Sequence, residues 1–497
     1  MKFCPSTVAL LSAWPVSSAS GIPESCCASL QASPLHTNLF YPNSLAYNQS
    51  VSSYFSVNAQ LDPTCIVQPH TAEQVSLAVS TLSRNGSSPC KFAVRSGGHT
   101  IWAGAANIEP GVTIDLSMMN STTYHKDTQT ASILPGSRWQ AVYKTLGKYN
   151  RTVAGGRGGT VGVGGFLIGG GNTFHTARVG FACDNVLNYQ IVLGNGTIAN
   201  ANKHSNADLY KALKGGTINF GIVTRYDMAT IEGDLLWGGV VTYDNSTTSQ
   251  QIPAISNFID NIHNDPYASY IGMWGYSSAT GQNAITNAYE YTKPVARAPA
   301  FDEFLAIKNT SDTMHFGSMY NLTVDLVQAS GTRNVFLTST YFNNPKVMEK
   351  AVDIHNDLIE EAKKQVQSKS WSMVTMVQPW PTLFAELSAK KGGNVLGLER
   401  FDRNMFQTLF DYSWDNAADD ALFNRLAQSI TEQLNGYAKE IGEDNPYIYL
   451  NYADKTQNPL QGYGEVNVKY IANVAKKYDP AGVFQRQVPG GFKVTEA

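Results

Sequence analysis

The pattern of hydrophobic and polar positions predicts helices and strands that follow one another through the first half of the chain. Residues 75–82 and 139–146 have the spacing of amphipathic helices, and Thr71 is placed to cap the first of them. Short apolar runs typical of buried strands occur at residues 92–94, 112–116, 186–193 and 220–224. Strands that alternate with helices in this way predict α/β or α+β layers.

Changes in amino-acid composition along the chain predict its domain organisation. Residues 20–60 are rich in Ser, Asn, Pro and Tyr, so we expect an entry segment with little regular structure. Residues 61–233 are rich in glycine and predict a first domain, whereas residues 234–440 predict a second. The remaining residues, 441–497, form an aromatic, Asn-rich C-terminal segment. Long amphipathic helices are expected in the second domain at residues 347–366 and 418–441.

The N-terminus has the features of an export signal over residues 1–19. Lys2 supplies a positive charge, residues 8–16 a short apolar stretch, and Ser17-Ser18-Ala19 a small-residue cleavage context. The alternative is a disordered apolar tail. Glycosylation acceptors of the form Asn-X-Ser/Thr agree with secretion and occur at Asn48, Asn85, Asn120, Asn150, Asn195, Asn245, Asn309 and Asn321. We expect a protein that is secreted or lies in the endomembrane lumen.

Composition narrows the class of protein. Of the 497 residues, 43% are hydrophobic and 15% charged, which supplies material for buried cores and argues against general disorder. The net charge of −3 leaves no excess of positive charge with which to bind the phosphates of a nucleic acid. No apolar run reaches the roughly 18–20 residues that span a bilayer. We therefore expect a soluble multi-domain protein with no nucleic-acid or membrane partner, while the oligomeric state stays open.

The cysteines predict disulfides and no metal site. Removal of the signal would take Cys4 and leave Cys26, Cys27, Cys65, Cys90 and Cys183. An odd number in an oxidising compartment indicates one or two disulfides and a free thiol. Cys90 is expected to pair with Cys26, Cys27 or Cys65, and the sequence does not choose among them. Cys183 is expected to be a buried thiol, and the cysteine spacings do not fit zinc.

Two glycine-rich segments are candidates for binding an anion. Residues 154–172 contain ten glycines, and a shorter segment is Arg95-Ser96-Gly97-Gly98. Because glycine has no Cβ, several backbone N–H groups can converge on one anion, and a pyrophosphate suits two such loops. A Rossmann dinucleotide site is disfavoured, because Gly162-X-Gly164 is followed by Gly165 and not by a helix-forming run. The structural alternative is that these glycines serve tight turns.

Several motifs together resemble the flavin domain of the vanillyl-alcohol oxidase superfamily. They are Arg95-Ser96-Gly97-Gly98-His99, the glycine-rich loop, Gly180 to Val186, and Asn219-Phe220-Gly221-Ile222-Val223-Thr224. The tail, with Tyr449-Leu450-Asn451-Tyr452-Ala453-Asp454, Tyr463-Gly464-X-X-Asn467 and Tyr478-Asp479-Pro480, is similar to the berberine bridge enzyme-like branch. The resemblance covers residues 60–235 and 440–492. It implies an α+β fold with a two-subdomain FAD-binding domain and a substrate domain whose antiparallel sheet is covered by helices.

The resemblance also implies which residues hold the cofactor. In the family, the histidine that matches His99 is bonded to the 8α-methyl group of FAD, and the two glycine loops cradle the pyrophosphate. The implied cofactor-binding residues are Arg95, Ser96, Gly97, Gly98, His99, Thr100, Thr160, Val161, Gly164, Gly165, Gly170, Asn172, Asp184, Asn185, Gly221, Ile222 and Asn451.

Two positions refine this expectation. Many family members carry a second covalent link from a cysteine, and Gly158 stands at that position here, so the resemblance implies a single bond through His99. Lack of the second bond favours a smaller and less polar substrate than an oligosaccharide. Val161 matches a position where family oxidases carry valine, which favours O₂ as the electron acceptor.

Catalysis needs a proton acceptor near the carbon that gives up hydride. Tyr452 is the first candidate, because the matching aromatic residue faces the active site in relatives; alternatively it only packs and hydrogen-bonds the flavin. Asp411 lies on a predicted substrate-domain strand and is the second candidate, with an exposed strand residue as the alternative. His175, four residues after Gly171, is expected to be a solvent-exposed loop residue, with an approach to the flavin ring as the alternative.

The resemblance therefore implies an FAD-dependent oxidase that transfers hydride from a small secondary-metabolite substrate to the flavin and reduces O₂ to H₂O₂. A non-redox isomerase or cyclase on the same fold is one alternative. An oligosaccharide oxidase is another, and a non-catalytic flavin-binding protein is a third.

Overall fold

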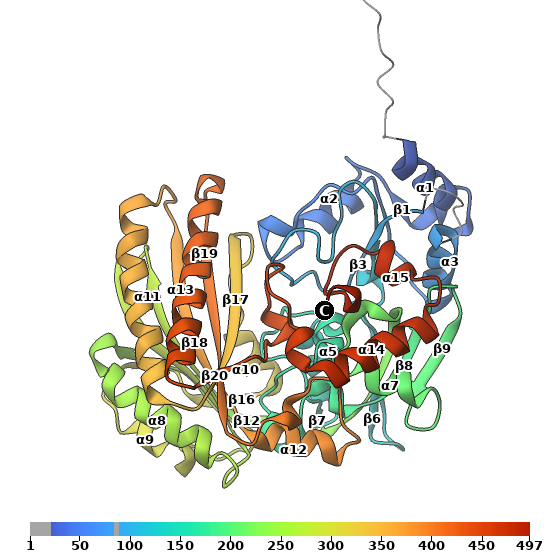
Figure 1. Cartoon of the computed structure of the whole chain (residues 1–497). Coiled ribbons are helices and arrows are strands. Elements are labelled where there is room, and N and C mark those ends of the chain that lie inside the picture. The colour runs from blue at the N-terminus through green and yellow to red at the C-terminus, as the bar shows by residue number, and fades with distance from the viewer. Residues whose placement is uncertain (1–20, 84–88) are drawn as a thin grey trace, which may run out of the picture.

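The computed structural model describes residues 21–83 and 89–497, which form two lobes side by side (Figure 1). The predicted export signal over residues 1–19, Cys4 and the acceptor Asn85 lie outside the described residues. One lobe is built on sheets of four, five and two strands, and the other on a single nine-stranded sheet. The fold is therefore α+β, and the nine-stranded sheet is antiparallel, as predicted for the second domain.

The four-stranded sheet is assembled from the predicted early strands. Its order is β1 (Leu39–Phe40), β2 (Cys65–Val67), β4 (Val112–Asp115) and β3 (Phe92–Arg95). The pairs β2–β4 and β3–β4 are parallel, and β1 is antiparallel to β2. Helix α3 (Ala72–Ser83) packs its apolar face, including Val75, Val79 and Leu82, into the same core as these strands. The helix begins where Thr71 Oγ1 accepts a hydrogen bond from the Gln74 backbone, as the capping pattern predicted.

The five-stranded sheet forms the second part of this lobe and is antiparallel throughout. Its order is β5 (Thr122–His125), β6 (Thr130–Ile133), β10 (Ile222–Ala229), β8 (Val186–Val192) and β9 (Ile198–Asn202). The accompanying short elements are α4 (Trp139–Gly147), α5 (Val163–Ile168), α6 (Thr176–Val179) and α7 (Ala207–Leu213), with β7 (Arg151–Thr152) paired to β11 (Ile231–Glu232). A Rossmann site would need parallel strands here, so this topology disagrees with it.

The glycine-rich segment contains one element that the sequence did not predict. Helix α5 follows Gly162, although residues 162–165 were expected not to lead into a helix. Its apolar residues Val163 and Leu167 are fully buried in the core of the lobe. Tertiary burial therefore outweighs the low helix propensity of its glycines.

The second lobe is one antiparallel sheet with helices on one face (Figure 1). Its order is β15 (Asn309–Asp312), β12 (Leu235–Asp244), β14 (Gln282–Tyr291), β13 (Ala268–Ser277), β18 (Trp371–Trp380), β19 (Met405–Trp414), β17 (Arg333–Phe342) and β20 (Asp444–Asn445), with β16 (His315–Ser318) also paired to β12. The covering helices are α8 (Thr248–Asn261), α11 (Pro345–Gln365) and α13 (Asp420–Glu440), and the short helices are α9 (Asp302–Leu305), α10 (Met319–Asp325) and α12 (Thr382–Lys390). The two long helices were predicted within a few residues of these bounds.

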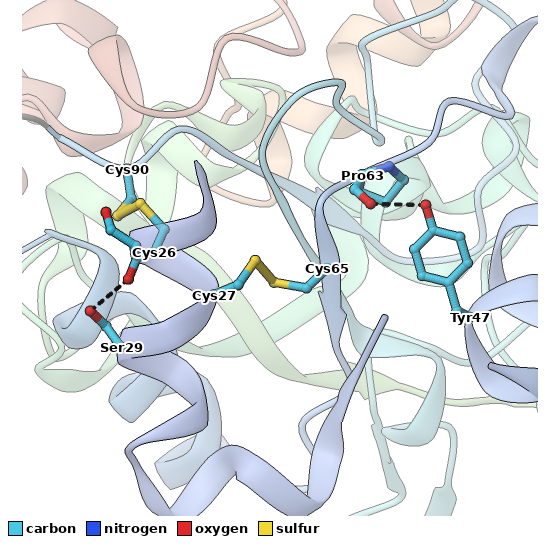
Figure 2. Close-up of a disulfide and its surroundings, with 8 residues drawn as sticks. Cys26, Cys27, Ser29, Tyr47, Pro63, Cys65 and Cys90 are labelled. Atoms are coloured by element: carbon cyan, nitrogen blue, oxygen red, sulfur yellow. Dashed lines mark hydrogen bonds between the residues drawn. A yellow bond between two sulfur atoms is a disulfide. The ribbon is translucent and has the colours of Figure 1, made fainter. Parts of the chain in front are cut away.

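The entry segment is more ordered than its composition predicted. It contains helices α1 (Gly21–Gln31) and α2 (Leu45–Ser52), where we expected little regular structure. Two disulfides join α1 to the four-stranded sheet, Cys26–Cys90 before β3 and Cys27–Cys65 at the start of β2 (Figure 2). Cross-links to a buried sheet, which no local pattern shows, account for the error. Both disulfides and the buried free thiol of Cys183 agree with the predicted count.

The C-terminal segment returns to the first lobe. After β20 pairs with β17 in the nine-stranded sheet, α14 (Glu465–Tyr478) packs near α7, and α15 (Val483–Arg486) follows. The Asp479 carboxylate accepts hydrogen bonds from the backbone of Val483 and Phe484, which fixes the turn into α15. The tail thus contacts both lobes.

The described residues contain neither a candidate membrane span nor a candidate metal cluster. Within residues 21–83 and 89–497, no helix has the length and apolar character needed to cross a bilayer. The same ranges hold no group of three or more His, Cys, Asp or Glu side chains placed to share a metal ion.

Candidate active site

A cavity of about 350 Å³ is walled by the glycine-rich loops, the open face of the nine-stranded sheet and the tail. From the first lobe, residues 96–102, 156–158, 161, 162, 164–166, 221 and 222 line it. The sheet contributes Ile271, Met273, Ala288, Phe336, Met376, Gln378 and Leu409. The tail contributes residues 449–453. The cavity therefore collects elements from all three predicted segments.

The two glycine loops touch each other through their backbones. A Cβ on Gly97 would lie 2.4 Å from the Gly162 Cα, and a Cβ on Gly162 would lie 2.5 Å from the Gly97 Cα. Ser96 Oγ accepts a 3.0 Å hydrogen bond from the Gly164 N–H and fixes this contact. Gly165 is exposed to the cavity, with no atom within 4 Å of the position its Cβ would take. The loops thus leave a backbone-lined space that suits an anion such as a pyrophosphate.

His99 follows β3 and faces this space. Its ring stacks on Phe55, and its Nε2 lies 3.5 Å from Thr160 Oγ1. Burial lowers the pKa of the His99 imidazole to about 4, and the positive charge of Arg138 adds to the effect. The ring is therefore neutral near pH 7, with a lone pair free for bonding.

Most of the predicted cofactor residues come together at this cavity. Those that line it are Ser96, Gly97, Gly98, His99, Thr100, Val161, Gly164, Gly165, Asn172, Gly221, Ile222 and Asn451. Thr160 approaches His99 from beside the wall, and Gly170 precedes Asn172 with a positive φ of 108°. Arg95, Asp184 and Asn185 lie elsewhere.

Arg95 is buried behind the loop and holds the entry segment. Its Nη2 donates a 2.7 Å hydrogen bond to Ser53 Oγ, and its guanidinium lies 4.0 Å from the Tyr54 ring centroid. Nη1 is 3.8 Å from the Asp115 carboxylate. Arg95 thus links the residues after α2 to the ends of β3 and β4, and does not line the cavity.

Asp184 and Asn185 lie in a buried junction. The Asp184 carboxylate accepts from the Phe181 backbone at 3.0 Å and from Ser388 Oγ at 2.6 Å, and burial raises its pKa. Asn185 Nδ2 donates to the carbonyl of Phe181 at 2.8 Å. Because Ser388 belongs to α12, these contacts connect the first lobe to the segment that follows β18.

The prediction for His175 was wrong. The side chain is 1% exposed and lies between Phe174 and Ala177, which belong to the hydrophobic core. Within the described residues neither ring nitrogen has a hydrogen-bond partner, and burial followed by the charge of Arg178 lowers the pKa of His175 to about 3. Thr173 and Thr176 are hydrogen-bonded to each other at this turn, where the chain enters the core.

Tyr452 belongs to a polar group on the cavity wall. Its hydroxyl accepts a 3.1 Å hydrogen bond from Nη2 of Arg157, which also donates to Oε1 of Gln378. Nearby, Asn451 Nδ2 donates to the Phe166 carbonyl at 3.1 Å and to the Tyr449 hydroxyl at 3.0 Å. The tail, the glycine loop and β18 therefore meet in one hydrogen-bond network.

Asp411 is half-buried next to the cavity and does not line it. It lies two residues after Leu409 on β19, so both side chains are on the same face of the sheet. Gln328, which lines the cavity, donates a 2.8 Å hydrogen bond to the Asp411 carboxylate. Burial raises the pKa of Asp411 to about 7, with the Gln328 hydrogen bond opposing.

Sequence reasoning missed most of the wall opposite the glycine loops. Phe336, Met376 and Leu409 cluster with Phe55 and Ile101, and this apolar surface faces the cavity. Arg157 and Gln378 were also missed. Each had a signal: Arg157 interrupts the glycine run, and Gln378 interrupts an apolar strand face.

Comparison with known proteins relates this chain to FAD-binding proteins. The FAD binding domain family matches residues 63–202. The FAD-dependent monooxygenase sdcF of Emericella nidulans is 51% identical, covering 96% of this chain and 99% of the relative. The FAD-dependent monooxygenase drtC of Aspergillus calidoustus is 40% identical over 95% of this chain and 90% of the relative.

Solved structures share the fold at low sequence identity. The 6-hydroxy-D-nicotine oxidase of Arthrobacter nicotinovorans has a TM-score of 0.74 at 18% identity, covering 90% of this chain and 96% of its own. The glucooligosaccharide oxidase of Acremonium strictum has a TM-score of 0.73 at 18% identity, over 94% and 98%. The berberine bridge enzyme-like protein 1 of Physcomitrella patens has 0.71 at 18%, over 94% and 98%.

Proposed function

The chain belongs to the family of FAD-binding oxidoreductases that includes sdcF and drtC. We propose that it is an oxidase of the berberine bridge enzyme-like branch that takes hydride from a small, weakly polar substrate and passes the electrons to O₂. FAD binding and an oxidoreductase function follow from the family. The observation that carries the finer proposal is the position of the His99 imidazole, which stacks on Phe55 at a cavity with an amide-lined side and an apolar side.

The residues present fit FAD. The Gly97–Gly162 contact leaves backbone N–H groups for a pyrophosphate, and Gly165 opens onto free space. We propose one covalent bond, from the His99 ring. The Acremonium oxidase is described as carrying a 6-S-cysteinyl, 8α-N1-histidyl FAD. Gly158 stands where the resemblance places that second link, and no cysteine lines the cavity among the described residues.

Bound FAD would supply a two-electron hydride acceptor. The chain's own residues have other tasks. Tyr452, whose oxygen accepts a hydrogen bond from Arg157, would take the substrate proton as a phenolate, and Asp411 is an alternative acceptor next to the same wall. The apolar side chains of Phe336, Met376 and Leu409 would keep water away from the part of the cavity that Tyr452 and Asp411 border.

A monooxygenase is the second candidate, because the sequence relatives sdcF and drtC carry that name. The two reactions differ in the fate of oxygen. An oxidase releases one H₂O₂ for each substrate molecule oxidised, while a monooxygenase places one oxygen atom in the product. Turnover under ¹⁸O₂ with parallel H₂O₂ measurement separates them: H₂O₂ equal to product and unlabelled product support the oxidase, and label in the product overturns it.

An anaerobic experiment tests whether the reaction is redox at all. Substrate found by screening a metabolite extract should bleach the visible flavin band without O₂, and air should restore it. A product formed while the flavin stays yellow would support the isomerase or cyclase instead. Bleaching by cello- or chito-oligomers would support an oligosaccharide oxidase.

We propose in addition that the protein is secreted or lies in the endomembrane lumen. The two disulfides support this, because disulfides persist in oxidising compartments. Expression of the full chain in a fungal host, with the medium and cell lysate assayed for a form that glycosidase shortens, tests it. An unglycosylated protein confined to the cytosol would contradict it.

A further inference from the structure

Arg157 is a buried cation at the cavity wall without an acidic partner. Its side chain is 8% exposed. Among the described residues no carboxylate forms an ion pair with it, and its hydrogen bonds run from Nη2 to the Tyr452 phenol oxygen and the Gln378 amide oxygen. Nε and Nη1 have no hydrogen-bond partner there, and they are not among the fully enclosed polar atoms. A guanidinium in this state has donors left for a ligand.

The carboxylic acid near Arg157 does not balance its charge. Glu290 lies two residues after the cavity-lining Ala288 on β14, on the same face of the sheet. Burial raises the pKa of Glu290 to about 8, against the opposing effect of Arg157, and Oε2 has no partner among the described residues. Burial therefore disfavours the charged form of Glu290, and among the described residues neither an ion pair nor a hydrogen bond joins Glu290 to Arg157.

The rest of the cavity is poor in charge. No Asp, Glu or Lys side chain is part of its lining in the described chain, and His99 is neutral. Opposite the glycine loops, the apolar lining residues are Ile271, Met273, Phe336, Met376 and Leu409, and the polar ones are the uncharged Gln328 and Gln378. A molecule in this space would meet apolar surface on one side and one cation with free donors at the edge.

We propose that Arg157 anchors an oxyanion carried by a largely apolar substrate, such as a carboxylate or an acidic phenol or enol. Guanidinium groups bind such oxygens with charge-assisted hydrogen bonds, which are stronger away from water. Tyr452 and Gln378 hold the guanidinium in place from the tail and from β18. This inference rests on the proposed function only in taking the cavity as the substrate site.

The test uses the purified, flavin-loaded full chain with benzoate as probe and benzamide as its uncharged counterpart. Affinities are measured at pH 7 by calorimetry and by changes in the visible flavin spectrum. We expect benzoate to bind at least about tenfold more tightly than benzamide, the effect of one charge-assisted contact. Equal affinities would overturn the proposal with the wild-type protein alone.

Variants then assign the effect to Arg157. We expect Arg157→Met to weaken benzoate at least about tenfold and benzamide less than about threefold, and Arg157→Lys to keep part of the preference. Arg403→Met, at an exposed arginine outside the cavity lining, is the matched control and should change neither affinity. An equal loss for both probes in Arg157→Met would show a structural role and overturn the proposal.

Two further measurements separate other sources of negative charge. If Arg157 serves the charge of the reduced flavin, Arg157→Met lowers the flavin reduction potential while the benzoate preference survives, which overturns the proposal. Glu290→Gln should leave benzoate affinity within about twofold, and a tenfold gain would show that Glu290 already neutralises Arg157. Since binding needs no turnover, a protein that shows the preference and oxidises nothing would refute the oxidase proposal alone.

Discussion

The imidazole of His99 lies against the phenyl ring of Phe55, with the ring centroids 4.1 Å apart and 16° between the planes. The Phe55 backbone N–H also donates a 3.0 Å hydrogen bond to the Gly98 carbonyl. Ring and backbone contacts together fix the direction in which Nε2 points, toward Thr160 and the cavity. The entry segment, which carries Phe55, thus positions the residue proposed to hold the cofactor.

His99→Ala should abolish covalent flavin attachment, because the neutral imidazole is the proposed bonding group. The measurement is flavin fluorescence of the denatured band on a gel, with peptide mass analysis. His204→Ala, at an exposed histidine outside the cavity lining, should keep full fluorescence. Phe55→Leu should slow attachment without abolishing it. Fluorescence that persists in His99→Ala would place the bond elsewhere.

Two glycines in the same helix region should respond differently to alanine. At Gly165 a Cβ meets no atom within 4 Å but enters the proposed FAD space, so Gly165→Ala should lower flavin content while helix stability rises by about 0.5–1 kcal/mol. At Gly169 a Cβ would lie 1.7 Å from Asn451 Oδ1, so Gly169→Ala should destabilise the protein by about 1–3 kcal/mol.

The ratio of visible to ultraviolet absorbance reports flavin content, and thermal unfolding of flavin-free protein reports stability. Full flavin content in Gly165→Ala would show that the cofactor does not occupy the space in front of this residue.

The parts of the site that were predicted are those in which a local motif carries the information. Gly97, Gly98 and His99 are adjacent in sequence, and their backbone geometry follows from glycine itself. Helices α3, α11 and α13 were found because each has a long apolar stripe, which few other patterns imitate.

The parts that were missed depend on contacts between distant segments. Arg157 meets Tyr452 only because the tail returns to the glycine loop, and no periodicity in either segment reports that meeting. Helix α1 is ordered through Cys26 and Cys27, whose partners are not fixed by local sequence. His175 was misjudged because a glycine-rich surrounding is typical of surface loops, whereas here the chain turns into the core.

Loss of the Cys27–Cys65 disulfide should destabilise the first lobe. The bond closes a loop with a sequence separation of 38 residues, which on chain-entropy grounds contributes about 4 kcal/mol. Cys27→Ala with Cys65→Ala should therefore increase cleavage of the entry segment in limited proteolysis and lower the melting temperature. Cys183→Ala, at the buried free thiol, is the control and should leave that segment protected. Equal protection of both variants would contradict the prediction.

Tyr452→Phe tests the first candidate base. The substitution removes the hydroxyl that accepts from Arg157 and keeps the ring that packs on the apolar cluster. If this oxygen takes the substrate proton, kcat should fall by about 10²–10⁴-fold with flavin content unchanged. Single-turnover bleaching of the flavin under anaerobic conditions measures the step directly. A change of less than about threefold would leave Tyr452 with a packing role.

Asp411→Asn tests the second candidate through pH. Burial raises the pKa of Asp411 to about 7, so the carboxylate that could accept a proton forms only as the pH rises through 7. If Asp411 is the base, a plot of kcat/KM against pH for the wild-type protein should rise as the pH passes through 7. This pH-dependent limb should vanish in Asp411→Asn. Gln328→Ala removes the 2.8 Å hydrogen bond to the carboxylate and should move the limb to higher pH.

Stability gives an independent reading of the same group. A carboxyl whose pKa is higher in the folded than in the unfolded protein binds its proton more tightly when folded, so its contribution to stability is lost as the pH rises from about 4 to 7. Urea unfolding of the wild-type protein should therefore show a decline over this range that is smaller in Asp411→Asn. An unchanged kinetic limb together with a smaller decline in stability would mean that Asp411 titrates as expected but does not take the substrate proton, which would leave that role to Tyr452.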